Sequence, residues 1–207
     1  MLTEYLTSAL VTLLVVIDPP GLGPIFLGLT GGMTTAQRRS TAMRACLIAT
    51  GILVFFAFFG EKLLALVGIG IPAFRIAGGL LLFSIAFEML FDKRSQRKGE
   101  VAQTAVSTDH IHNVAAFPLA IPLMAGPGAI TACILLAARA KGDPYALAGL
   151  TGMIVLVTLA SFVVFLVAGP VSRLLGVTGN IVLTRLLGVL LSALAIQFIV
   201  DGVLALR

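Results

Sequence analysis

The sequence predicts an all-α polytopic membrane protein. We expect six transmembrane helices in two inverted three-helix repeats, with helices 1 and 4 discontinuous. Composition is the first reason: hydrophobic residues make up 59% of the 207-residue chain and charged residues only 11%, and the mean hydropathy is +1.11. Soluble globular domains do not reach such values. The second reason is that proline and glycine interrupt two apolar segments at matching places in the two halves.

The length bounds the number of domains. A membrane-spanning helix needs about 20 apolar residues, so the chain has room for one bundle and little else. We expect a single transmembrane bundle over residues 1–207, with repeat one at about 1–91, a connecting loop at about 92–113 and repeat two at about 114–207. The net charge of +5 comes from basic residues spread over short loops, so a lipid bilayer and not a nucleic acid is the expected surroundings.

Polar stretches divide the chain into apolar segments, the expected spans. They cover about 5–30, 42–67, 71–91, 114–140, 145–168 and 180–206. The first segment is interrupted at Asp18–Gly21 and the fourth at Pro122 and at Ala125–Gly128. Because proline removes a backbone donor and clashes with the preceding turn, each interruption predicts two half-helices in place of one rod.

The two halves correspond in the order of their features. Pro127-Gly128 aligns with Pro20-Gly21, and the Arg-x-x-Gly pattern beginning at Arg185 aligns with the one beginning at Arg75. Each half contains three expected spans, so the second half starts on the opposite side of the membrane and the repeats are inverted. This pattern predicts a secondary transporter whose site lies at the interface of the repeats, near the bilayer midplane.

The polarity of helix ends suggests what such a site binds. Half-helices that begin after the two Pro-Gly pairs present free N–H groups and a partial positive charge, which attract a carboxylate. The preceding half-helices end in free carbonyls, which can receive an ammonium group or a cation. Both breaks together therefore match a zwitterion. The expected substrate-binding residues are Asp18, Pro20, Gly21, Gly126, Pro127, Gly128 and Thr131.

The same stretches resemble a known family. Residues Asp18 to Thr30 are similar to the Asp/Asn-Pro-x-Gly-x-x-Pro-x-Phe-x-x-Leu-Thr signature of the MarC family of inner-membrane proteins, and residues Phe117 to Ile130 are similar to its second signature. The resemblance implies six spans in the cell inner membrane. Through the SnatA-type transporters of that family, it also implies transport of small neutral amino acids such as glycine or alanine.

Several individual roles stay open at this point. Asp18 can be a helix N-cap, a residue for proton or substrate coupling, or both. Arg75 and Arg185 can act in coupling or gating, or can extend to the lipid headgroups. The small residues at the breaks can serve close helix packing alone. No metal site is expected, since His110 and His112 have no third ligand, and no cofactor is expected besides coupling to H⁺ or Na⁺.

The expected function is transport by alternating access at a midplane site formed by the two broken helices. The alternatives are a small-solute channel, an exporter of other small metabolites, or a non-transport membrane assembly subunit. An enzyme is not expected, because catalytic side chains do not cluster in the sequence. Eight Lys and Arg residues fall in the loops on one side and four on the other, which places both termini outside the cell. A homo-oligomer is left open.

Overall fold

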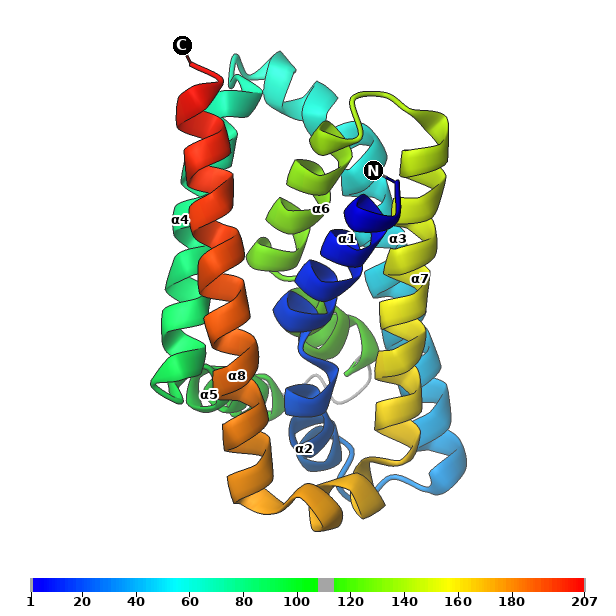
Figure 1. Cartoon of the computed structure of the whole chain (residues 1–207). Helices are drawn as coiled ribbons and strands as arrows, with labels where there is room; N and C mark the ends of the chain where they lie inside the picture. The colour runs from blue at the N-terminus through cyan, green and yellow to red at the C-terminus, as the bar shows by residue number, and fades with distance from the viewer. Residues whose placement is uncertain (1, 108–113, 207) are drawn as a thin grey trace.

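The computed structural model describes residues 2–107 and 114–206, without the side chains of 104–107 and 170–178. All regular elements in these ranges are helices, packed as one bundle (Figure 1). They are α1 (Leu2–Ile17), α2 (Pro19–Leu29), α3 (Thr35–Leu66), α4 (Ile71–Leu90), α5 (Lys93–Ser107), η2 (Ala115–Met124), α6 (Pro127–Arg139), α7 (Pro144–Leu166) and α8 (Ala168–Leu204).

The described helices confirm the all-α membrane class. Among the described residues five spans are long and apolar enough to cross a membrane, with α1 and α2 together forming the first of them, and the bent pair η2–α6 is a sixth if it is counted as one span. Both termini lie at the same end of the bundle (Figure 1), as an even number of spans requires. The inversion that relates the two halves stays a prediction.

The first predicted break is confirmed, and it is confined to one residue. Asp18 has φ 59° and ψ 63°, the left-handed conformation that aspartate tolerates better than most residues. Pro19 and Pro20 then occupy the first turn of α2, where a proline costs no hydrogen bond. The Leu22 N–H still donates to the Asp18 carbonyl at 3.1 Å, so α2 starts directly after the break.

The second predicted break is confirmed too, and it is wider. Helix α6 is bent by 57° from η2. Inside η2, Phe117 (φ −133°, ψ 126°) and Ile121 (φ −123°, ψ 125°) are extended. Each precedes a proline, and steric clash with the proline ring disfavours the helical conformation at such a position. Two extended residues therefore interrupt the span before Gly126 caps the start of α6.

Two membrane helices begin earlier than their predicted segments. Helix α3 starts at Thr35 and not near residue 42, because Thr34 and Gln37 form a capping box: the Gln37 N–H donates to Thr34 Oγ1 at 3.3 Å, and the Thr34 N–H donates to Gln37 Oε1 at 2.8 Å. Helix α8 starts at Ala168 and not near residue 180. Its first turns run across one end of the bundle before it rises beside α4 (Figure 1).

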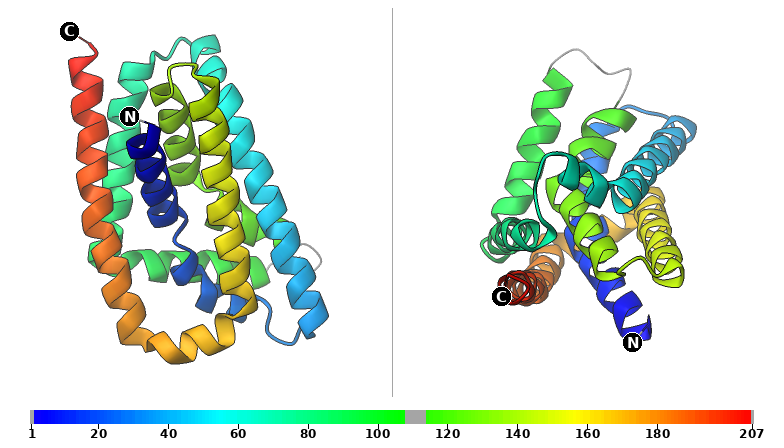
Figure 2. Two further views of the ribbon diagram at one scale, coloured as in Figure 1. Left: turned by 45° about the vertical axis from the view of Figure 1, so that its right-hand side comes forward. Right: turned by 90° about the horizontal axis from the view of Figure 1, so that it is seen from above.

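The prediction of a loop at about 92–113 was wrong for most of that stretch. Residues Lys93–Ser107 form helix α5, which crosses the bundle near the end opposite to the termini (Figure 2). The segment contains no proline and is rich in the good helix formers Lys, Arg, Gln, Glu and Ala. Its low hydropathy had indicated a loop. His110 and His112 lie outside the described residues, so the structure does not test their expected surface role.

Small residues allow the long helices to approach closely. Where α4 and α8 run side by side in opposite directions (Figure 1), a Cβ atom added at Gly79 would lie 2.8 Å from the carbonyl oxygen of Ala195. One added at Gly188 would lie 3.2 Å from the carbonyl oxygen of Ala86. Close backbone approach of this kind is a main source of helix association in lipid, where no hydrophobic difference separates helix and solvent.

Candidate functional site

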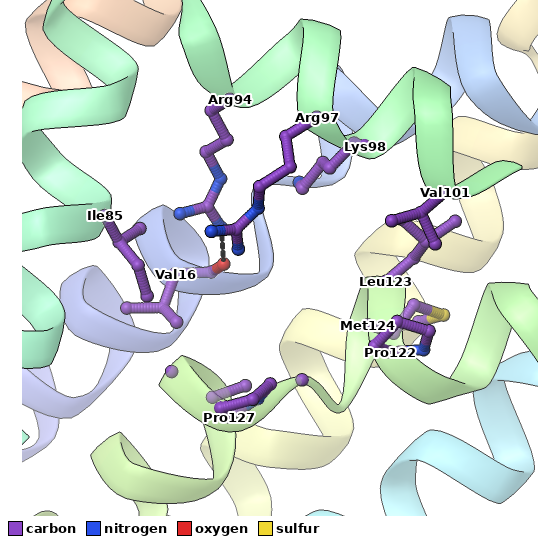
Figure 3. Close-up of a pocket in the computed structure, with 13 residues that line it drawn as sticks. Val16, Ile85, Arg94, Arg97, Lys98, Val101, Pro122, Leu123, Met124 and Pro127 are labelled. Carbon is purple, nitrogen blue, oxygen red and sulfur yellow. Dashed lines mark hydrogen bonds between the residues drawn. The ribbon is translucent and has the colours of Figure 1, made fainter.

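A cavity of about 80 Å³ lies between the two helix breaks (Figure 3). One wall comes from the end of α1, the opposite wall from the turn between η2 and α6, and the basic face of α5 closes a third side. The lining residues are Val16, Ile85, Arg94, Arg97, Lys98, Val101, Pro122, Leu123, Met124, Gly126, Pro127, Gly128 and Ala129. The fold therefore brings together two interruptions that lie more than a hundred residues apart in the sequence.

Asp18 is buried at the first break, where only 3% of its surface is exposed. Its Oδ1 accepts a hydrogen bond from the Gly21 N–H at 3.2 Å, so the carboxylate caps α2 as one of the two interpretations predicted. Its other oxygen, Oδ2, lies 3.2 Å from the ammonium nitrogen of Lys98 on α5. The same carboxylate thus holds a helix start and a buried cation.

Helix α5 also binds the carbonyl end of α1. Lys98 Nζ donates to the Ile17 carbonyl at 3.4 Å, and Arg94 Nη2 donates to the Val16 carbonyl (Figure 3). The last carbonyls of a helix have no partner within the helix and carry a partial negative charge, which cations stabilise. The sequence predicted that these carbonyls receive an ammonium group or a cation, and in this structure the chain's own α5 supplies it.

The cations around the cavity differ in their partners. Lys98 pairs with Asp18, and Arg97 Nη1 pairs with Glu88 at 2.7 Å while its own side chain is 62% exposed. Arg94 is only 7% exposed, and within the described part of the chain no carboxylate lies at ion-pair distance from it. Its Nε is buried and has no hydrogen-bond partner. Arg94 is thus a buried charge whose hydrogen-bonding capacity is partly unused.

Burial sets the acidity of the two inward-facing cations. Desolvation lowers the pKa of Lys98 from 10.5 to about 8, although the nearby Asp18 carboxylate opposes this change. Desolvation also lowers the pKa of Arg94, against the opposing effect of Asp18 and Glu88. Arginine keeps its proton in proteins, so Lys98 is the group of this cluster that can change its charge near neutral pH.

The start of α6 forms the wall opposite Arg94. Its N-cap is Gly126, and no side chain caps it within the described ranges. The N–H groups of Gly128 and Ala129 belong to the first turn, which has no carbonyl partners inside the helix. A Cβ atom at Gly126 would lie 2.3 Å from the Pro122 carbonyl oxygen, so only glycine fits at the turn that sets the direction of α6.

The predicted substrate-binding residues fall into two groups. Gly126, Pro127 and Gly128 line the cavity. The first break contains Asp18, Pro20 and Gly21, which are not among the lining residues. On that side the cavity is lined by Val16 of α1. Thr131 is buried one turn further along α6, where it packs against Gly78 of α4: a Cβ atom at Gly78 would lie 2.6 Å from Thr131 Cγ2.

The arginines predicted to act in coupling or gating lie away from the cavity. Arg75 is half-buried near the start of α4 and packs beside Gly202 of α8, whereas Arg185 is exposed on α8. The sequence reasoning missed Arg94 and Lys98 as site residues, although both line the cavity. Their spacing of four residues, repeated at the buried Ala102, was a helical signal inside the polar stretch.

The fold and the site together define a polytopic membrane protein with a small polar cavity between two broken helices. The chain belongs to the MarC family of integral membrane proteins, whose family model matches residues 3–206. Both stretches from which the resemblance was inferred lie within that match.

Full-length relatives support the membership. The chain is 40% identical to the UPF0056 membrane protein YhcE of Escherichia coli over 92% of this chain and 88% of the relative. It is 35% identical to the UPF0056 membrane protein MJ1677 of Methanocaldococcus jannaschii, over 97% and 96% of the two chains, and 33% identical to YvbG of Bacillus subtilis, over 98% and 95%. No solved structure gives a significant match to the chain.

Proposed function

We propose that this protein is a secondary transporter of small neutral amino acids, which works by alternating access around the cavity between the two breaks. The observation that carries the proposal is that one cavity meets both Val16, at the carbonyl end of α1, and Gly128, at the amino end of α6. The amino end of α6 suits the carboxylate of such a solute, and the carbonyl end of α1, which Arg94 and Lys98 occupy in this structure, can take its ammonium group once α5 moves away.

The size of the cavity supports a small solute. A buried water needs about 10–15 Å³ by the same measure, so about 80 Å³ accommodates several water-sized groups. Glycine and alanine have this size, whereas larger amino acids would need the walls to move. The apolar parts of Ile85 and Val101 in the lining suit a substrate with little polar surface beyond its two charged groups.

The proposed location is the inner membrane of the cell, with both termini external. The basic helix α5 lies toward the end opposite to the termini (Figure 1), and Lys and Arg are enriched on the cytoplasmic side of membrane proteins. In this orientation the Asp18–Lys98 pair closes the cavity from the cytoplasmic side. Binding and release on that side then require movement of α5 or of the α1–α2 break.

Counterflow in proteoliposomes tests the proposal. Vesicles with purified protein are loaded with unlabelled glycine or alanine and diluted into the labelled amino acid, beside protein-free vesicles as the control. We expect saturable exchange, and net uptake driven by a H⁺ or a Na⁺ gradient. Flux that does not saturate would favour a small-solute channel. Absence of exchange and of uptake under either gradient would contradict amino-acid transport.

A further inference from the structure

Arg94 has more hydrogen-bonding capacity than the protein uses. Within the ranges that the structure describes, only its Nη2 has a hydrogen-bond partner, the Val16 carbonyl, while its Nε is buried without one. A buried charge is costly unless it is paired, and a buried donor without a hydrogen bond is costly as well. The other two cations of α5 at the cavity, Arg97 and Lys98, already have carboxylate partners. In the described part of the chain, Asp18 and Glu88 act on Arg94 from beyond ion-pair distance, so an anion in the cavity could pair with it directly.

The uncapped start of α6 borders the same cavity. Gly128 and Ala129 contribute lining and carry first-turn N–H groups, which side chains of the described chain leave uncapped. Figure 3 shows the guanidinium of Arg94 and the α6 start at Pro127 on opposite sides of the cavity. Two independent groups of donors, one charged and one dipolar, therefore line the same cavity.

We infer that Arg94 and the first turn of α6 form the subsite that binds the carboxylate of the transported solute. The carboxylate accepts hydrogen bonds from Arg94 on one side and from the N–H groups of Gly128 and Ala129 on the other. Charge-assisted hydrogen bonds to guanidinium groups are among the stronger polar contacts, and helix starts bind anions readily. Glycine at position 128 lets Ile85 of α4 and Val16 of α1 pack against the start of α6, since both side chains occupy the place that a Cβ atom would take.

The inference rests on the proposed function for the identity of the solute, but not for the chemistry of the subsite. A structural role is the competing explanation, in which Arg94 does no more than stabilise the carbonyl end of α1. The two explanations differ in one measurable respect. A stabilising residue alters how much folded protein there is, whereas a carboxylate-binding residue alters which ligands are distinguished.

The experiment measures ligand binding to the purified full-length protein in nanodiscs, without transport. The probes are glycine, glycinamide, which lacks the carboxylate, and acetate, which lacks the ammonium group. The variants are Arg94→Gln, Arg94→Lys and, as the matched control, Lys93→Gln. Lys93 is the exposed neighbour of Arg94 on α5, so this control removes the same charge from the same helix outside the cavity.

We expect the wild-type protein and Lys93→Gln to bind glycine at least tenfold more tightly than glycinamide. Arg94→Gln should lose that preference, and Arg94→Lys should retain part of it, because lysine keeps the charge but not the planar fork. If Arg94→Gln does not yield folded protein, the test is the preference of Arg94→Lys for glycine over glycinamide, which should be weaker than that of the wild type. Equal preference for glycine in Arg94→Lys and in the wild type would overturn the inference.

The remaining outcomes separate the subsite from the proposed function. Binding of acetate that depends on Arg94, with no binding of glycine, would support the subsite and contradict an amino acid as the substrate. Equal binding of glycine and glycinamide would overturn the subsite and leave amino-acid transport standing. If the wild-type protein binds neither glycine nor acetate, the subsite is overturned.

Discussion

The ammonium nitrogen of Lys98 lies 3.2 Å from Oδ2 of Asp18, with 10% and 5% of the two side chains exposed. These residues join α5 to the break between α1 and α2 across 80 positions of the sequence. Lys98 lines the cavity on the side that α5 covers. Because separating two buried charges is costly, the pair is well placed to keep that side closed until a compensating change occurs.

A double-mutant cycle should show strong coupling in this pair. Asp18→Asn and Lys98→Gln each leave the other residue of the pair as a buried charge without its partner. Removing one partner of a buried ion pair typically costs about 3–5 kcal/mol of stability. We expect the double variant to be less destabilised than the sum of the singles, with a coupling energy of about 1–3 kcal/mol. Unfolding of the purified protein in detergent measures these differences.

The Arg97–Glu88 pair provides the control for that cycle. Arg97 is 62% exposed, so solvent screens the interaction and the coupling should stay below about 1 kcal/mol. For the exposed pair, the destabilisations caused by the two single substitutions should nearly add. If those of Asp18→Asn and Lys98→Gln also add, the buried contact contributes little to stability.

The low pKa of Lys98 predicts a pH dependence with a definite sign. Folded protein loses this proton near pH 8, while the unfolded chain keeps it until about pH 10.5. Between these values the unfolded state binds more protons, so the contribution of Lys98 makes stability rise with pH in that window. The charged groups that face Lys98 are Asp18, Arg94 and Arg97.

Transport should respond to the same deprotonation. Loss of the Lys98 proton leaves Asp18 without its cation, so the rate of transport should change with a midpoint near pH 8. Lys98→Arg should remove this inflection, since arginine stays charged, while the cap that Asp18 makes to Gly21 remains. Initial rates and thermal stability between pH 6.5 and 10, for wild type and Lys98→Arg, check both effects. An unchanged inflection in the variant would exclude Lys98 as its source.

The broken helices could be predicted because their causes are local. Proline lacks an N–H, and the residue before a proline avoids the helical conformation whatever surrounds it, so Pro19-Pro20 and Pro122 marked the interruptions in the sequence itself. The apolar composition of each span was equally local. These features gave the membrane class, the approximate spans and the two sides of the cavity formed by the breaks.

The role of α5 could not be predicted in the same way. A segment of low hydropathy forms a buried helical face only because Asp18 and the carbonyl end of α1 compensate the charges of Arg94 and Lys98. That compensation is tertiary and joins positions about 80 residues apart. The four-residue spacing of the two cations indicated a helix, but nothing in the spacing showed what the helix would cover.

Two of the three glycines of α2, Gly21 and Gly28, should respond differently to substitution by alanine. At Gly21 an added Cβ would lie 2.2 Å from Asp18 Oδ2, so Gly21→Ala must displace the carboxylate that caps α2 and pairs with Lys98. At Gly28 the described part of the chain places no atom within 4 Å of an added Cβ, apart from the helix's own backbone. We expect Gly21→Ala to lower the stability by about 1–3 kcal/mol, as for a lost buried hydrogen bond.

Gly28→Ala is the matched control in the same helix. Alanine favours helices over glycine by up to about 1 kcal/mol, so this variant should be neutral or slightly more stable. Melting temperatures of the two variants and the wild type, in the same detergent, give the comparison. A Gly21→Ala variant as stable as Gly28→Ala would show that the Asp18 carboxylate can move without consequence.

The proposed orientation predicts which side of the membrane each lysine faces. Lys62 lies near the end of α3 that is close to the termini, and Lys93 starts the basic helix α5 near the opposite end (Figure 1). Both side chains are exposed, whereas the native Cys46 and Cys133 are buried and should react slowly with thiol reagents. Single Lys62→Cys and Lys93→Cys variants can therefore be compared in the native background.

In intact cells a membrane-impermeant maleimide should label Lys62→Cys and spare Lys93→Cys, and inside-out vesicles should give the reverse, because positive charge is retained on the cytoplasmic side. The reverse pattern in intact cells would place both termini and Lys62 in the cytoplasm, and α5 would then close the cavity from the outside.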